Sequence, residues 1–167
     1  MKMLDSSTCS LPLGEIRIVM DEGSLVLLDF EENGQRSHNL LMKRYGEYSL
    51  REVSCPRQVR KSLDSYFAGE LEVFGQIKMD PSGTPFQSTV WDALKRIPAG
   101  ESWSYSRLAN EIGNPRAARA VGSANASNPI SIMIPCHRVI TQNGRLSGYA
   151  GGTSRQRWLL QHEGALA

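Results

Sequence analysis

Polar and apolar residues alternate along residues 15–20, and an apolar stretch follows from Leu25 to Phe30. The D-E-G-S segment between them places Gly23 where a tight turn needs it, so the pattern predicts a β-hairpin. Further on, the expected elements are a helix over 37–45, a strand over 48–53, a helix from Pro56 to a stop at Gly69, and a strand over 71–77. The first half is therefore predicted to be a small α/β unit.

A turn-rich linker, D-P-S-G-T-P at 80–85, follows this unit. Thr84, Pro85 and Gln87 then supply an N-cap, a residue suited to the first helical position and a capping-box partner. Apolar residues continue at helical spacing as far as Ile97, and P-A-G-E at 98–101 ends the predicted helix. We therefore expect two domains, residues 1–80 and 84–167.

Two short helices are expected next. Ser104 can cap the first, which stops at Gly113, and Asn114 with Pro115 starts the second immediately, to end near Ala126. A helix, a tight turn with glycine and a second helix are typical of a helix-turn-helix that binds DNA. Two helices joined in this way also occur as plain packing units, so the pattern leaves both interpretations open.

The rest of the chain combines buried and glycine-rich segments. Residues 130–134 form an apolar run typical of a buried strand, and they lead directly into P-C-H-R at 135–138. Asn143-Gly144 is a turn signal, and S-G-Y-A-G-G at 147–152 is a loop whose backbone can approach a ligand closely. A last helix is expected from Thr153 to Glu163-Gly164.

The charge of the chain is unevenly distributed. Residues 1–83 hold ten Lys/Arg against thirteen Asp/Glu, a net charge of −3, whereas residues 84–167 hold nine against four, a net charge of +5. An arginine-rich basic half favours phosphate contacts, although a solvated surface would have the same composition. Three cysteines without C-x-x-C spacing argue against a disulfide framework and a cysteine zinc site, so we expect no metal and a cytoplasmic location. No apolar run is long enough to cross a membrane.

Cys136 is the candidate nucleophile, because His137 and Arg138 follow it directly. A free thiol is only about 3% thiolate at pH 7, and a neighbouring imidazole and guanidinium favour the charged form. Complete ionisation would gain roughly 2 kcal/mol, so positioning and stabilisation of the leaving group must supply the rest of the acceleration. Because adjacent residues rarely point the same way, His137 is expected to act through a water and to need a carboxylate that orients it.

The run N-P-I-S-I-M-I-P-C-H-R-V-I at 128–140 resembles the active-site segment of the O6-alkylguanine-DNA alkyltransferases, also called methylated-DNA–protein-cysteine methyltransferases. T-P-F-Q-S-T-V-W, A-A-R-A-V-G, G-Y-A-G-G and W-L-L-Q-H-E-G fit the family in the same order and spacing. The resemblance implies an α+β fold of two domains. The first is small, α/β and ribonuclease H-like; the second is helical and winged-helix-like, with a helix-turn-helix.

The resemblance also implies a role for individual residues. Cys136 would accept the alkyl group, with His137 as base, Glu163 as its orienting carboxylate, Asn128 as the hinge before the active-site turn, and Tyr105 as the donor to guanine N3. The residues expected around the substrate are Val139, Tyr149, Ala150, Gly151 and Ser131, with the carbonyls of Cys136 and Val139 on the guanine amine and the amide of Ala150 facing O6. The residues expected to contact DNA are Arg119, which fills the gap left by the extruded nucleotide, and Arg116, Ala117, Ala118, Gly122 and Ser104.

These roles describe irreversible, single-turnover transfer from O6 of guanine in duplex DNA to Cys136, with O4 of thymine as an open alternative. The base must be extruded from the duplex, and the small side chains of the second helix allow close approach in the minor groove. The sulfur must then be exposed to an unstacked purine. We expect no cofactor, no membrane contact and a monomeric protein. Ser131 and Ala150 stand where some members have proline and serine, which leaves the accepted adduct size open.

Two other functions fit parts of the pattern. A cysteine hydrolase acting through an acyl-enzyme would use the same Cys-His pair, but it would turn over repeatedly and need no DNA. A non-catalytic helix-turn-helix regulator would keep its function without Cys136 and would prefer a defined DNA sequence.

Overall fold

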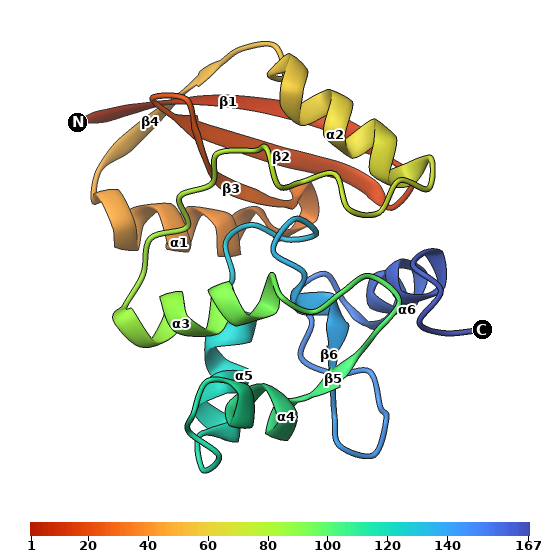
Figure 1. The fold of residues 1–167 in the computed structure, drawn as a ribbon. Helices are drawn as coiled ribbons and strands as arrows, with labels where there is room; N and C mark the ends of the chain where they lie inside the picture. Colours follow the sequence, from red (N-terminus) through yellow and green to blue (C-terminus); the bar gives the residue numbers. More distant parts are fainter. The chain divides into compact units, whose positions relative to one another are not determined.

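A computed structural model describes the whole chain, residues 1–167, and divides it into two compact units, Met1–Ser82 and Gly83–Ala167 (Figure 1). The first unit is built on a β-sheet and the second consists mainly of helices, so the expected two-domain α+β class is confirmed. No helix in the structure combines the length and the apolar character that a membrane span requires.

The N-terminal unit contains a four-stranded sheet and two helices. Its elements are β1 (Lys2–Leu11), β2 (Gly14–Asp21), β3 (Ser24–Phe30), α1 (Gly34–Tyr45), β4 (Tyr48–Glu52) and α2 (Arg57–Phe67). The strand order is β3-β2-β1-β4, with β1 antiparallel to β2 and parallel to β4. The expected hairpin is therefore present as β2 and β3, whereas the sequence pattern had not indicated β1.

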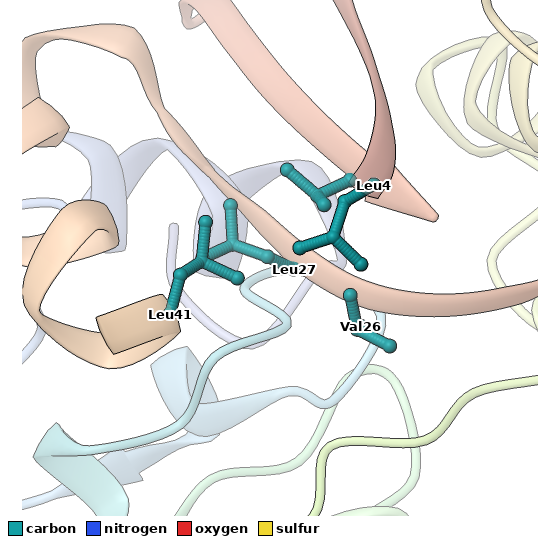
Figure 2. Packing of buried hydrophobic residues seen from close by; sticks show 5 residues of the cluster. Leu4, Val26, Leu27 and Leu41 are labelled. Carbon is teal, nitrogen blue, oxygen red and sulfur yellow. The ribbon is translucent and has the colours of Figure 1, made fainter. Parts of the chain in front are cut away.

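The two faces of the sheet pack against different helices. Leu4 of β1 belongs to an apolar cluster with Val26, Leu27 and Leu41, the last of these on α1 (Figure 2). Side chains alternate between faces along a strand, so Cys9 of β1 points to the opposite face. Arg60 of α2 contacts Cys9 there, and this places α2 on the face that α1 leaves uncovered.

The strand expected over 71–77 is wrong. This segment consists of turns, in which the Ile77 amide donates to the carbonyl of Phe74 at 3.1 Å, and strand-like pairing is limited to an isolated bridge between Leu25 and Met79. The apolar residues are instead used for packing, because the ring of Phe74 lies 5.2 Å from the ring of Tyr66 on α2. An apolar run beside a helix can bury its side chains without a strand partner.

The C-terminal unit contains α3 (Pro85–Leu94), β5 (Trp103–Ser104), α4 (Tyr105–Glu111), α5 (Ala118–Ala126), β6 (Val139–Ile140) and α6 (Thr153–His162). The capping box that starts α3 is confirmed: the Gln87 amide donates to the Thr84 hydroxyl at 3.1 Å, and the Thr84 amide donates to the Gln87 side chain at 3.0 Å. The helix ends at Leu94, earlier than expected, although Ile97 is still buried.

The helix expected to start at Asn114-Pro115 begins later, at Ala118. A turn occupies the intervening residues, and the Ala117 amide donates to the carbonyl of Asn114 at 3.0 Å. The proline therefore belongs to the connection between the helices and not to the first helical turn. The connection is longer than the sequence pattern predicted.

Candidate functional site

The helices α4 and α5 pack against each other and carry most of the residues expected to contact DNA. Ser104 caps α4, since its hydroxyl accepts a hydrogen bond from the Arg107 amide at 3.0 Å. Arg116 and Arg119 are exposed, while the small residues between and after them are half-buried: Ala117, Ala118 and Gly122. The two arginines are therefore free to reach a phosphate or a base, and the helix-turn-helix function of this pair stays a prediction.

Asn128 organises the turn that follows α5. It is fully buried, and its Nδ2 donates to the carbonyls of Ile134 at 2.8 Å and Ile130 at 3.3 Å, while its Oδ1 accepts from the Ile130 amide at 3.0 Å. One side chain thus bonds three backbone groups, and of these the Ile130 carbonyl also accepts from the Ile134 amide at 3.1 Å. A backbone group buried without a partner is costly, so this asparagine is required for the turn.

The prediction of a strand over 130–134 is wrong, because the Asn128 side chain and a turn bond the backbone of this segment. These residues are buried, but they form a turn in which the Ile134 amide donates to the Ile130 carbonyl at 3.1 Å. Ile132 has φ +71°, a left-handed conformation that a β-branched residue rarely adopts. The hydroxyl of Ser131, a residue expected near the alkyl group, is buried without a hydrogen-bond partner.

Cys136 begins a short 3-10 helix, Cys136–Arg138, directly after this turn. Its amide donates to the Ile134 carbonyl at 2.8 Å, and its own carbonyl accepts from Asn125 Nδ2 at 3.4 Å. Only 2% of the residue is exposed, so the expectation of an open thiol is wrong for this structure. Neighbouring residues therefore cover Cys136, and a nucleobase can reach the sulfur only after some of them move.

His137 lies in the short helix that begins at Cys136, and Glu163 directly follows α6; the fold brings the two side chains together. His137 Nε2 lies 2.9 Å from Glu163 Oε2, and both side chains are fully buried. Arg138 approaches the same carboxylate with two nitrogens, Nε to Oε1 at 2.8 Å and Nη2 to Oε2 at 3.0 Å, while its Nη1 donates to the carbonyl of Ile97. Arg138 therefore forms an ion pair with Glu163. The sequence pattern predicts that its charge favours the thiolate of Cys136, and the geometry shows the contact with Glu163 instead.

The electrostatics of this trio define its protonation. Burial would raise the pKa of Glu163, but the hydrogen bonds and charges of His137 and Arg138 outweigh it and hold that pKa well below its ordinary value. Burial lowers the pKa of His137, and Glu163 only partly offsets the effect. The carboxylate is therefore charged and the imidazole neutral at pH 7. Nε2 must then carry the proton it donates to Glu163, which leaves Nδ1, buried without a partner, as an acceptor.

Tyr105, at the start of α4, lies close to the nucleophile. Burial raises the pKa of its hydroxyl, and a negative charge on Cys136 raises it further. The hydroxyl donates to the carbonyl of Ser147 at 3.0 Å. Gly148 follows with φ +79°, and a Cβ there would lie 2.6 Å from the Tyr105 oxygen, so only glycine allows the loop to come this close.

The glycine-rich loop and β6 supply the remaining expected substrate contacts. Tyr149 is nearly buried, with its ring edge-on to the His137 ring at 6.2 Å, and Gly151 is buried while Ala150 is half-buried. The Val139 carbonyl accepts from Gln156 Nε2 at 3.1 Å. A carbonyl oxygen can accept more than one hydrogen bond, and contact of Val139 with a guanine amine stays a prediction.

Sequence reasoning missed one residue of this site and misassigned another. Gln156 of α6 is buried, and its Nε2 donates both to Val139 and to the carbonyl of His137 at 3.2 Å. A lone glutamine on a polar helix gives no sequence signal of such a role. Arg138 was named only as a neighbour of the thiol, whereas it binds Glu163. No group of three or more His, Cys, Asp or Glu side chains is placed to hold a metal ion.

Comparison with known proteins bears directly on this site. Residues 85–165 match the family model described as 6-O-methylguanine DNA methyltransferase, DNA binding domain, and residues 6–81 match the ribonuclease-like domain of the same family. The chain belongs to this methyltransferase family. The two matches cover both units of the chain, and only residues 82–84 separate one match from the other.

Named relatives agree with this assignment. The methylated-DNA–protein-cysteine methyltransferase of Salmonella typhimurium is 47% identical over 158 residues, which cover 93% of this chain and 92% of that protein. A protein of the same name from Methanosarcina acetivorans is 44% identical over 92% of this chain and 94% of its own. The methyltransferase fold is therefore shared over nearly the whole length of both.

Solved structures extend the agreement to three dimensions. The O6-methylguanine methyltransferase of Mycobacterium tuberculosis superposes with a TM-score of 0.82 at 39% identity, covering 99% of this chain and 95% of that one. A crystal structure of the M. tuberculosis protein in complex with DNA superposes with a TM-score of 0.81 at 39% identity, covering 96% and 93%. That methyltransferase binds DNA.

Proposed function

We propose that this protein repairs DNA by direct reversal, moving a methyl or larger alkyl group from O6 of guanine onto Cys136. The observation that carries the proposal is the buried arrangement at the nucleophile, where a neutral His137 is bonded through Nε2 to an ionised Glu163 and keeps Nδ1 free. Membership of the methyltransferase family supplies the reaction. The individual roles below are inferred from the geometry.

His137 generates the thiolate. Its Nδ1 accepts the thiol proton through a water, and the positive charge that develops on the ring is stabilised by Glu163 at 2.9 Å. Arg138 keeps the carboxylate ionised and fixed in orientation through its two contacts. Because His137 is buried and neutral before the reaction, it is a competent base at pH 7.

The chemical step is an in-line displacement at the alkyl carbon. The Cys136 sulfur forms a carbon–sulfur bond while the carbon–oxygen bond to guanine breaks, and the electron pair leaves with the guanine. Tyr105, which keeps its proton because its pKa is raised, donates a hydrogen bond to N3 and stabilises the departing anion. Water does not hydrolyse a thioether under these conditions, so each molecule reacts once and no cofactor is needed.

Access to the sulfur requires duplex DNA to present an extruded base. A base paired inside a duplex is out of reach, and flipping it costs a few kcal/mol. The exposed Arg119 fills the vacated position, and the half-buried Ala117, Ala118 and Gly122 let α5 lie close to the minor groove. To donate to guanine N3, the Tyr105 hydroxyl must also leave its hydrogen bond to the Ser147 carbonyl. We propose that the protein acts as a monomer; activity on O4 of thymine is a further outcome to test.

The deciding experiment is intact-mass analysis after incubation with a duplex that contains one O6-methylguanine. We expect one added methylene unit per protein molecule, mapped to Cys136, and a stoichiometric end point. Cys136→Ala should abolish transfer and keep DNA binding, while the matched variant Cys55→Ala should react normally. Transfer by Cys136→Ala would refute the assignment, and repeated turnover would favour the cysteine hydrolase instead.

The role of Arg119 has its own test. Arg119→Ala should react slowly with duplex DNA and at a near-normal rate with the free base O6-methylguanine, because only the duplex requires a nucleotide to be replaced. The exposed Arg145 offers a matched arginine control. Equal losses on both substrates would contradict a role in base flipping.

A further inference from the structure

Two thiols in the N-terminal unit lie outside the repair site, Cys9 on β1 and Cys55 in the segment that follows β4. β1 and β4 pair in parallel, with Ser6 opposite Glu52, and the Val53 amide continues the ladder by donating to the Ser6 carbonyl at 2.8 Å. The ladder ends there, because residues 53–56 form no strand, but the same register continued three residues further would set Cys9 opposite Cys55. Adjacent strands are about 4.8 Å apart, within the Cα separation that a disulfide accepts.

The side chains follow this register. Cys9 acts directly on the Cys55 thiol: burial first, and then the hydrogen bond and charge of Cys9, raise the pKa of Cys55 to about 12. Both cysteines are free thiols, with Cys9 4% exposed and Cys55 half-buried. The pair has no third ligand, because no group of three or more His, Cys, Asp or Glu side chains could hold a metal.

A cation and a cavity accompany the pair. The Arg60 guanidinium contacts the Cys9 sulfur, and this hydrogen bond is the first cause that raises the pKa of Arg60. A guanidinium at this position can stabilise the negative charge that leaves on oxygen when the sulfur attacks a peroxide. Cys55 and Arg60 also line an open cavity of about 550 Å³ together with Asp64, large enough to admit a small oxidant.

We propose that Cys9 and Cys55 form a redox-active pair that a small peroxide converts to a disulfide. The Cys9 thiolate attacks one oxygen of hydrogen peroxide, giving the Cys9 sulfenic acid and hydroxide. The Cys55 sulfur then attacks the Cys9 sulfur, and its proton leaves with the sulfenic oxygen as water. Both sulfurs are oxidised by one electron each, and one peroxide is reduced. The bond joins β1 to Cys55, two residues before α2 (Arg57–Phe67).

The cross-link is measurable in the full-length protein by peptide mapping without reduction. Trypsin releases Cys9 in the peptide 3–17 and Cys55 in the peptide 52–57, each with a single cysteine. After hydrogen peroxide we expect these two peptides joined, a loss of two hydrogens from the intact mass, and separation on reduction. Oxidation should also raise the melting temperature of the protein by several degrees, because the bond closes a long loop.

Variants separate the proposed pair from general oxidation. Cys55→Ser should leave Cys9 as a sulfenic acid that dimedone traps. Arg60→Gln should slow cross-linking at least about fivefold, since the hydroxide that leaves in the first step loses a neighbouring cation. The matched control Arg57→Gln, on the same helix, should cross-link at the normal rate. The proposal is overturned if Cys9 and Cys55 remain unlinked at a peroxide dose that oxidises Cys136, or if Arg60→Gln cross-links as fast as the unchanged protein.

Discussion

Glu163→Gln tests the reasoning about the site most severely, because the change is nearly isosteric. The carboxylate accepts three hydrogen bonds, one from His137 and two from Arg138, at 2.8 to 3.0 Å. An amide has one oxygen and one NH2 group, so in either orientation an NH2 faces an N–H donor. The substitution also leaves a buried arginine without its counter-charge, and breaking a buried pair in this way costs about 3–5 kcal/mol. Against a total stability of about 5–15 kcal/mol, the loss is large.

The same change alters the tautomer of His137 when the NH2 group takes the place of Oε2. It then donates to Nε2, so Nδ1 carries the hydrogen and can no longer accept the thiol proton. We expect the single-turnover rate of methyl transfer to fall by about 10²–10⁴, the usual contribution of a general base. Urea unfolding gives the stability, and transfer from an O6-methylguanine duplex, measured where the variant is folded, gives the rate. The control is Glu101→Gln, an exposed glutamate of the same unit. A loss below 1 kcal/mol with an unchanged rate would refute the reasoning.

Other substitutions and conditions test separate parts of the site. Because the pKa of His137 is lowered in the folded protein, the unfolded chain binds a proton first below pH 6.5, and stability should fall with decreasing pH by up to about 1.4 kcal/mol per unit. Glu163, whose pKa is lowered from 4.5, adds to the loss below about pH 4.5. A flat profile in urea titrations from pH 8 to 3 would contradict both. Asn128→Ala should cost about 3 kcal/mol in urea unfolding, since the buried Ile134 carbonyl and Ile130 amide lose their partner. Gly148→Ala should lower the melting temperature, at a cost of about 1–3 kcal/mol, and an unchanged value would show that the loop yields freely. Tyr105→Phe should slow transfer roughly tenfold with little effect on stability, so equal rates would remove it from the leaving-group role.

Local sequence signals predicted the parts of the fold that depend on local chemistry. The box formed by Thr84 and Gln87 starts α3 as expected, and Gly23 lies in the β2–β3 turn. The resemblance to the family brought His137 and Glu163 into one hypothesis, although 26 positions separate them. No periodicity could have paired them, because their contact depends on how α6 packs.

The wrong expectations share a physical cause. Apolar runs at 71–77 and 130–134 indicated strands. Burying apolar side chains stabilises the fold whether or not their backbone pairs with another strand, so such runs do not by themselves identify a strand. In the second run a single buried side chain, Asn128, replaces the ladder. β1 was missed for the opposite reason, since it buries Ser6 and Ser7 where a strand pattern normally has apolar residues.

The burial of the Arg138–Glu163 pair has a consequence for how the protein responds to ionic strength. Mobile ions screen exposed charges over about 10 Å at 0.1 M salt, but they do not enter a packed interior. The pair is sealed from solution, whereas Arg116 and Arg119 face it. Added salt should therefore weaken DNA binding, but it should not change the rate of alkyl transfer within the assembled complex.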